Sequence, residues 1–135
     1  MKLDHVAIAV SDLEAAIVAF RDQLGLTLEH VETVEAEGAR VAFFPVGDAH
    51  LELVSPARPD AAIARSIEKR GEGLHHVCFE VANIDSEIQR LLERGAALTS
   101  NAPTPGAGGS RVTFVHPKSM NGVLVELVEK PKSAC

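Results

Sequence analysis

Two histidines and two glutamates occur at matching places in the two halves of the chain. His5 and His76 each open a short run in which apolar residues alternate. Glu52 follows His5 by 47 residues and Glu126 follows His76 by 50, each inside an apolar segment. Imidazole and carboxylate groups together bind first-row divalent ions such as Co²⁺, Mn²⁺, Zn²⁺ or Ni²⁺. The four side chains predict one metal site with coordination positions left open for a bidentate substrate.

This prediction depends on the duplication, because a single histidine in a strand is more often structural than a ligand. A carboxylate within an apolar strand is costly unless it is paired, and here it occurs twice at the same place relative to a histidine. The remaining histidines have no partner in the repeat and are predicted not to bind the ion: His30, His50, His75 and His116. Cys78 and Glu80 share the alternation of His76 and are predicted to line the pocket.

Each His/Glu pair lies in a segment whose pattern predicts a strand, a helix and three further strands. In the first, a strand at Leu3–Val10 leads into a helix whose apolar residues recur at helical spacing as far as Gly25. Ser11 is its predicted N-cap. In the second, the helix is followed by a strand at Ala97–Ser100 and a long loop, residues 101–110, rich in glycine and proline.

The predicted fold class is α+β, with two βαβββ modules in a single domain of residues 1–135. Residues 3–56 form the first module, 57–72 a linker with a short helix, and 73–130 the second module. One helix covers one face of each four-stranded module, so the other face remains open. We expect the two open faces to pair into a cup, onto which strand alternation directs the two histidines and two glutamates.

Composition excludes several other classes of protein. The net charge of −6 and the absence of Trp and Tyr disfavour binding to nucleic acid. No apolar run is long enough to span a membrane, and no signal peptide is visible. Two cysteines, Cys78 and Cys135, are too few for a disulfide framework. The sequence predicts a cytoplasmic protein.

Three phrases resemble the methylmalonyl-CoA epimerase family: DHVAIAV at Asp4–Val10, GLHHVCFEV at Gly73–Val81 and HPKSMNGVLVEL at His116–Leu127. The likeness extends from about Leu3 to Glu129. That family belongs to the vicinal-oxygen-chelate superfamily, which also contains glyoxalase I and extradiol dioxygenases. The resemblance implies a glyoxalase-like fold, a homodimer, and a metal-dependent isomerase of propionate metabolism that interconverts (2R)- and (2S)-methylmalonyl-CoA.

The implied reaction needs an acid/base group on each side of C2, whose proton is acidified by the thioester and the carboxylate. Glu52 and Glu126 are the candidates for these two groups. Some epimerases that the sequence resembles carry Gln at the position of Glu52 and use a Glu on the preceding strand as a base. The counterpart of that Glu is Val41 here, so we expect Glu52 to act as base, with Glu37 as a reserve candidate.

Three polar residues of the second module are candidates for contacts with the substrate. Lys118, Ser119 and Arg111 are expected to meet the substrate carboxylate or the phosphates of the acyl-CoA. A glyoxalase I-type lyase acting on a glutathione hemithioacetal would use the same metal ligands and remains an alternative. An Fe(II) extradiol dioxygenase needs two histidines and one carboxylate, so the second glutamate argues against it. A metal-free binding module would favour aromatic grooves, which this composition does not supply.

Overall fold

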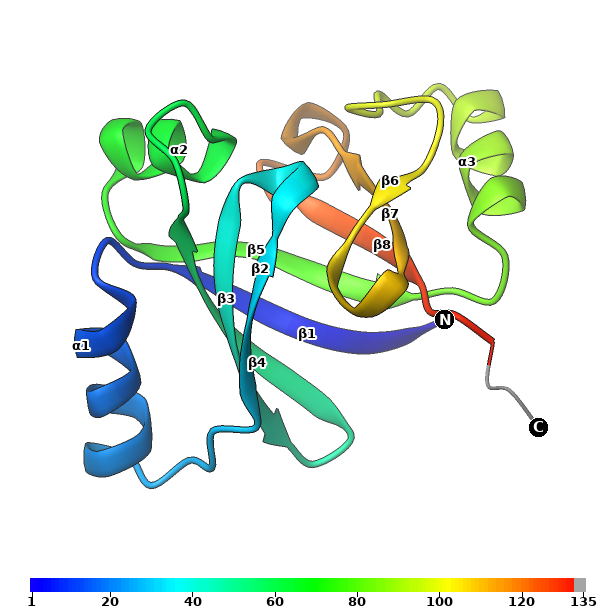
Figure 1. Ribbon diagram of the computed structural model, residues 1–135. Coiled ribbons are helices and arrows are strands. Elements are labelled where there is room, and N and C mark those ends of the chain that lie inside the picture. Colours follow the sequence, from blue (N-terminus) through cyan, green and yellow to red (C-terminus); the bar gives the residue numbers. More distant parts are fainter. Residues whose placement is uncertain (133–135) are drawn as a thin grey trace. The chain divides into compact units, whose positions relative to one another are not determined.

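The computed structural model describes residues 1–132, which divide into two compact units (Figure 1). The N-terminal unit comprises His5–His75, and the C-terminal unit comprises Met1–Asp4 and His76–Cys135, of which residues 133–135 lie outside the described part. Cys135 therefore also lies outside it. None of the helices within residues 1–132 is long and apolar enough to cross a membrane. The cytoplasmic location stays a prediction.

The N-terminal unit is built on a sheet whose strands lie in the order β2-β3-β4-β1. Strands β1 and β4 are parallel, whereas β3 is antiparallel to both of its neighbours. Strand β1 begins in the C-terminal unit and continues into this one. The elements are β1 (Lys2–Ala9), α1 (Leu13–Ile17), η1 (Val18–Gln23), β2 (His30–Val34), η2 (Glu35–Glu37), β3 (Ala39–Val46), β4 (Ala49–Pro56) and α2 (Ala62–Arg70).

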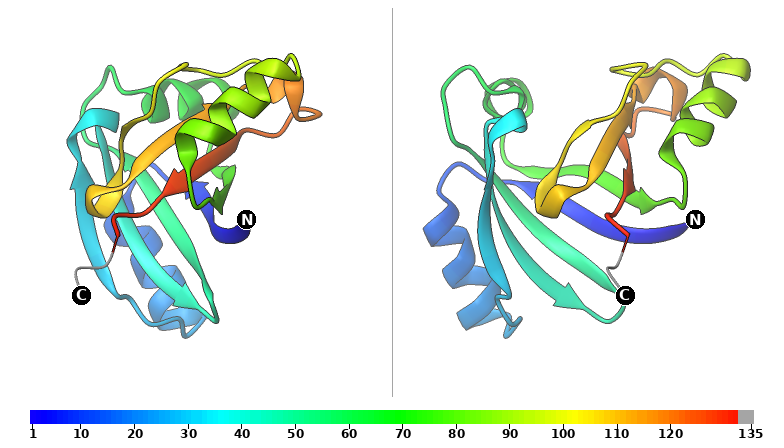
Figure 2. Two further views of the ribbon diagram at one scale, coloured as in Figure 1. Left: turned by 90° about the vertical axis from the view of Figure 1, so that its right-hand side faces the viewer. Right: turned by 45° about the vertical axis from the view of Figure 1, so that its right-hand side comes forward.

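Helix α1 packs against one face of this sheet. Leu13 and Ile17 of α1 pack against Phe44 and Leu53, all buried, and Figure 2 shows α1 beside β3 and β4. Side chains on a strand alternate between faces. Glu52 precedes Leu53 and therefore projects from the face opposite α1, as predicted.

The C-terminal unit has the strand order β5-β8-β7-β6, with β5 and β8 parallel and the other pairs antiparallel. Its elements are β5 (Gly73–Glu80), α3 (Ile84–Glu93), β6 (Thr104–Pro105), η3 (Ala107–Gly109), β7 (Arg111–Val115), η4 (Pro117–Ser119) and β8 (Val125–Glu129). Ile84 and Ile88 of α3 pack with Val81 and Leu127 on one face. His76, Cys78 and Glu126 belong to the opposite alternation.

Both units thus show the predicted βαβββ order, β1-α1-β2-β3-β4 and β5-α3-β6-β7-β8, and the α+β class is confirmed. The linker predicted at 57–72 contains α2 and belongs to the N-terminal unit.

Two local predictions are wrong, the N-cap of α1 and the strand at Ala97–Ser100. The N-cap of α1 is Asp12, whose Oδ1 accepts a hydrogen bond from Ala15 N at 3.1 Å, and the N–H of Ser11 donates to Glu72 Oε1 at 2.7 Å. The first helix itself extends as predicted, since α1 continues as the π-helix η1 to Gln23, just before Gly25. Of the predicted strand at Ala97–Ser100, only Leu98 forms a bridge, to Val115.

The edge strand of the C-terminal unit lies within the predicted loop. Within residues 101–110, Thr104 pairs with Val112 and Pro105 with Arg111, forming the two-residue strand β6. Proline lacks the N–H that a central strand would need, so it is tolerated at an edge. A pattern of alternating apolar residues cannot reveal so short an edge strand.

Candidate metal centre

In the N-terminal unit, β1 and β4 bring His5 and Glu52 together. The two strands run parallel, and Ala7, two residues after His5, lies opposite Glu52. His5 Nδ1 lies 2.9 Å from Glu52 Oε2. His5 is 5% exposed and Glu52 is 9% exposed, so the pair is buried on the face that α1 leaves open.

In the C-terminal unit, β5 and β8 bring His76 and Glu126 together in the same way. Cys78, two residues after His76, lies opposite Glu126 in the parallel pair. His76 Nε2 lies 2.9 Å from Glu126 Oε1, and the two side chains are only 8% and 7% exposed. Each predicted histidine therefore contacts the glutamate of its own half, and both pairs follow one construction.

These donor pairs fit a divalent ion by chemistry and by spacing. Two ligands bound to one ion at about 2.1 Å lie about 3 Å apart in adjacent octahedral positions, and each pair shows 2.9 Å. Imidazole nitrogen and carboxylate oxygen are both ligands that first-row divalent ions accept. Each pair thus offers two donor atoms at the spacing of adjacent ligands on one divalent ion.

A second group of polar side chains occupies the same face of the N-terminal sheet. Phe43 lies directly opposite Glu52, and His30 stacks on the Phe43 ring with centroids 4.4 Å apart. His50 meets the same ring edge-on at 6.5 Å. The carboxylate of Glu29 lies 3.2 Å from His30 Nδ1 and 3.5 Å from His50 Nε2. The sequence did not predict this cluster, because neither histidine has a partner in the repeat.

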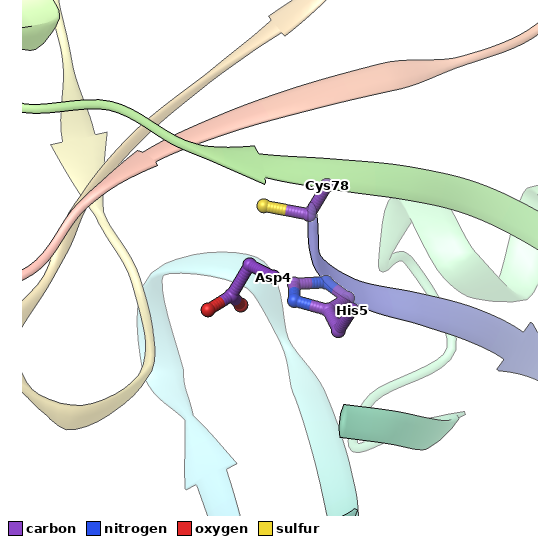
Figure 3. A group of neighbouring side chains, drawn as sticks. All are labelled: Asp4, His5 and Cys78. Carbon is purple, nitrogen blue, oxygen red and sulfur yellow. The ribbon is translucent and has the colours of Figure 1, made fainter. Parts of the chain in front are cut away.

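Cys78 has a charged neighbourhood within the C-terminal unit. Its Sγ and a carboxylate oxygen of Asp4 lie within 4.8 Å of each other (Figure 3). Lys130 Nζ binds Asp4 Oδ1 at 2.7 Å, and this hydrogen bond raises the pKa of Lys130 above its usual value. Cys78 is fully buried beside Glu126, which suits the predicted role in the pocket wall.

The predicted substrate contacts already have partners within the C-terminal unit. Arg111 binds Asp85 at 3.0 Å and Glu129 at 3.2 Å, and the hydrogen bond with Asp85 raises the pKa of its guanidinium. Ser119 Oγ accepts a hydrogen bond from the N–H of Ala97. The backbone N–H of Lys118 donates a hydrogen bond to His116 Nδ1 at the start of η4. This bond does not involve the side-chain ammonium of Lys118.

The two positions considered for a base on the preceding segment differ in character. Val41 is 3% exposed and pairs with Val54, so it forms an apolar wall on the face of Glu52. Glu37 lies in η2 and is half-buried instead of fully solvated. Val41 has no group that can accept a proton. The carboxylates within the two His/Glu pairs are those of Glu52 and Glu126.

Known proteins are similar to this chain in sequence and in fold. The family model described as "Glyoxalase/Bleomycin resistance protein/Dioxygenase superfamily" matches residues 4–114. The chain is 42% identical to an ethylmalonyl-CoA/methylmalonyl-CoA epimerase from Cereibacter sphaeroides, over 93% of this chain and 96% of that protein. It is 39% identical to the uncharacterized Bacillus subtilis protein YqjC, over 95% of this chain and 91% of that protein.

The structure resembles Streptomyces coelicolor methylmalonyl-CoA epimerase, solved as a variant in complex with 2-nitronate-propionyl-CoA. The TM-score is 0.91 at 34% sequence identity, covering 100% of this chain and 98% of that chain. The expected glyoxalase-like fold is thereby confirmed.

Proposed function

Because the chain belongs to the glyoxalase/bleomycin resistance protein/dioxygenase superfamily, we propose that it is a metal-dependent epimerase that interconverts (2R)- and (2S)-methylmalonyl-CoA. The observation that carries the proposal is the pair of buried imidazole–carboxylate contacts, one in each half of the repeat. The acyl-CoA substrate is supported by the relatives, several of which are methylmalonyl-CoA epimerases.

His5, Glu52, His76 and Glu126 are the proposed ligands of a single ion shared by the two pairs. Bound there, a divalent cation would supply positive charge to an enolate oxygen of the substrate. The identity of the ion stays open among Co²⁺, Mn²⁺, Zn²⁺ and Ni²⁺, since imidazole and carboxylate accept all four.

The protein's own part in the reaction is proton transfer at C2. One glutamate removes the proton from one side of C2, and a group on the other side returns a proton, which inverts the centre. We propose Glu52 and Glu126 for these two roles. Their burial favours the transfer, because water would otherwise compete for the carboxylate.

Recognition of the remainder of the acyl-CoA is proposed for Lys118, Ser119 and Arg111. Two carboxylates already offset the charge of Arg111, so Lys118 is the first of the three to test. Its ammonium would meet a phosphate or the substrate carboxylate as a point charge. The homodimer implied by the sequence resemblance stays a prediction.

The deciding experiment is proton exchange at C2 of methylmalonyl-CoA in deuterated water, followed by mass spectrometry with and without a chelator. We expect exchange from both epimers, its loss on chelation, and its return when a divalent ion is added. Absence of chelator-sensitive exchange would contradict the proposal. Turnover of a glutathione hemithioacetal in its place would identify the lyase alternative.

A further inference from the structure

An aromatic ring borders the His76–Glu126 pair within the C-terminal unit. Phe114 lies on β7 directly opposite Glu126 on β8, so both side chains project from the same face of the sheet. The ring also meets His76 edge-to-face, with centroids 5.5 Å apart and an interplanar angle of 88°. One side chain therefore contacts the histidine and flanks the carboxylate.

Glu126 is buried, whereas Phe114 beside it is only half-buried. Glu126 is 6% exposed, the side chain of His76 is 8% exposed and Cys78 is fully buried. Phe114 is half-buried, so part of this residue remains accessible beside Glu126. A ligand atom that approaches Glu126 from the side of β7 would therefore lie beside the Phe114 ring.

The chemistry of the substrate indicates which of its groups meets the ring. C2 of a 2-alkylmalonyl thioester carries a proton, a carboxylate, a thioester carbonyl and an alkyl group. The first is removed by a carboxylate, and the two oxygen-bearing groups need polar or cationic partners. Only the alkyl group gains by burial against an apolar surface.

We infer that Phe114 is a specificity-determining residue whose ring forms the wall against which the C2 alkyl group packs, so that its bulk limits the length of that group. The inference rests on the proposed acyl-CoA chemistry and deepens it. Removing ring volume would make room for a longer alkyl chain. One methylene in an apolar pocket changes discrimination by about 10- to 200-fold.

The repeat supplies a matched control in the N-terminal unit. Phe43 lies opposite Glu52 as Phe114 lies opposite Glu126. Phe43, however, is only 8% exposed, and His30 and His50 contact its ring. Because two histidines cover it, the same truncation of Phe43 should leave alkyl preference unchanged.

The test compares wild type, Phe114→Ala, Phe114→Leu and Phe43→Leu. Titration calorimetry gives the affinities for propionyl-CoA and butyryl-CoA, whose C2 carries a methyl and an ethyl group respectively and whose binding needs no turnover. The ratio of kcat/KM for ethylmalonyl-CoA over methylmalonyl-CoA is measured in parallel. Thermal unfolding of each variant shows whether it is folded, and Phe114→Leu serves where Phe114→Ala is not.

We expect the Phe114 variants to favour the longer alkyl group by about tenfold more than the wild type, both in the ratio of affinities and in the ratio of kcat/KM. In Phe43→Leu both ratios should stay at the wild-type value. Unchanged ratios in folded Phe114 variants that bind acyl-CoA would overturn the role of Phe114 alone. An equal shift in Phe43→Leu would overturn it too. Failure of the wild type to bind any acyl-CoA would overturn both this inference and the proposed function.

Discussion

The two glutamates carry the chemistry at the level of single residues, since each is a proposed ligand and a proposed base. Both lie 2.9 Å from an imidazole nitrogen and are nearly excluded from water. Gln keeps the shape and one donor oxygen of Glu but cannot accept a proton at neutral pH. Glu→Gln substitutions therefore separate proton transfer from metal binding.

Glu52→Gln should lower deuterium incorporation from one epimer by at least about 100-fold, because general-base catalysis contributes at least this much. Incorporation from the other epimer should fall less, and metal content measured by mass spectrometry should be retained. Glu126→Gln should show the opposite preference between epimers. Full rates from both epimers in Glu52→Gln, with a loss in Glu37→Gln, would make Glu37 the base.

Helix ends illustrate what local pattern can and cannot predict at the level of elements. Both modules start their helix with an Asx side chain that binds the N–H three residues on, Asp12 to Ala15 and Asn83 to Ser86. The sequence shows a serine and an aspartate side by side before α1. In the structure Asp12 is the cap, and the N–H of Ser11 donates to Glu72, sixty-one residues away, a contact that the local pattern cannot reveal.

Asp12→Ala should reduce the free energy of unfolding by about 1 kcal/mol, the usual value of an N-cap. Asn83→Ala should have an effect of similar size on α3. Ser11→Ala is the control, because its backbone N–H, not its side chain, makes the recorded bond. Urea unfolding monitored by circular dichroism gives the three values. An equal loss in Ser11→Ala would mean that Ser11 also caps the helix.

Strand patterns were more informative than helix ends, and for a physical reason. Alternation placed His5, Glu52, His76 and Glu126 on the faces opposite the helices, because a strand turns every second side chain to the same face. The same pattern could not identify β6, whose two residues are paired only because β7 supplies a free edge. It also could not predict that His30 and His50 would gather around Phe43, since that depends on β2, β3 and β4 pairing in one register.

For the whole molecule, the central question is how many ions two His/Glu pairs hold. A first-row ion that is bound tightly by a protein usually has three or four protein ligands. One His/Glu pair supplies two ligands, and both pairs together supply four. The proposed function requires that the pairs act on one ion. The number of ions bound per chain therefore distinguishes one shared site from two independent sites.

We expect one divalent ion per chain, measured by elemental analysis after dialysis. At a free concentration one hundred times Kd, that ion should stabilise the fold by about 2.7 kcal/mol, seen as a higher Tm that chelation reverses. His5→Ala and His76→Ala should each abolish the stabilisation, although they alter different units. Two equivalents of metal, or stabilisation that survives in either variant, would show that the pairs bind separately.

The sequence by itself determined the duplicated βαβββ order, the side of each strand that carries the polar residues, and the four candidate ligands. These properties follow from periodicity and repetition, which are local and readable along the chain. Tertiary structure decided that each histidine lies 2.9 Å from the glutamate of its own half and that Arg111 binds Asp85 and Glu129. It also decided that Phe114 lies beside Glu126 and that His30 and His50 contact the ring of Phe43. Those contacts join residues distant in sequence, and only strand register brings such side chains together.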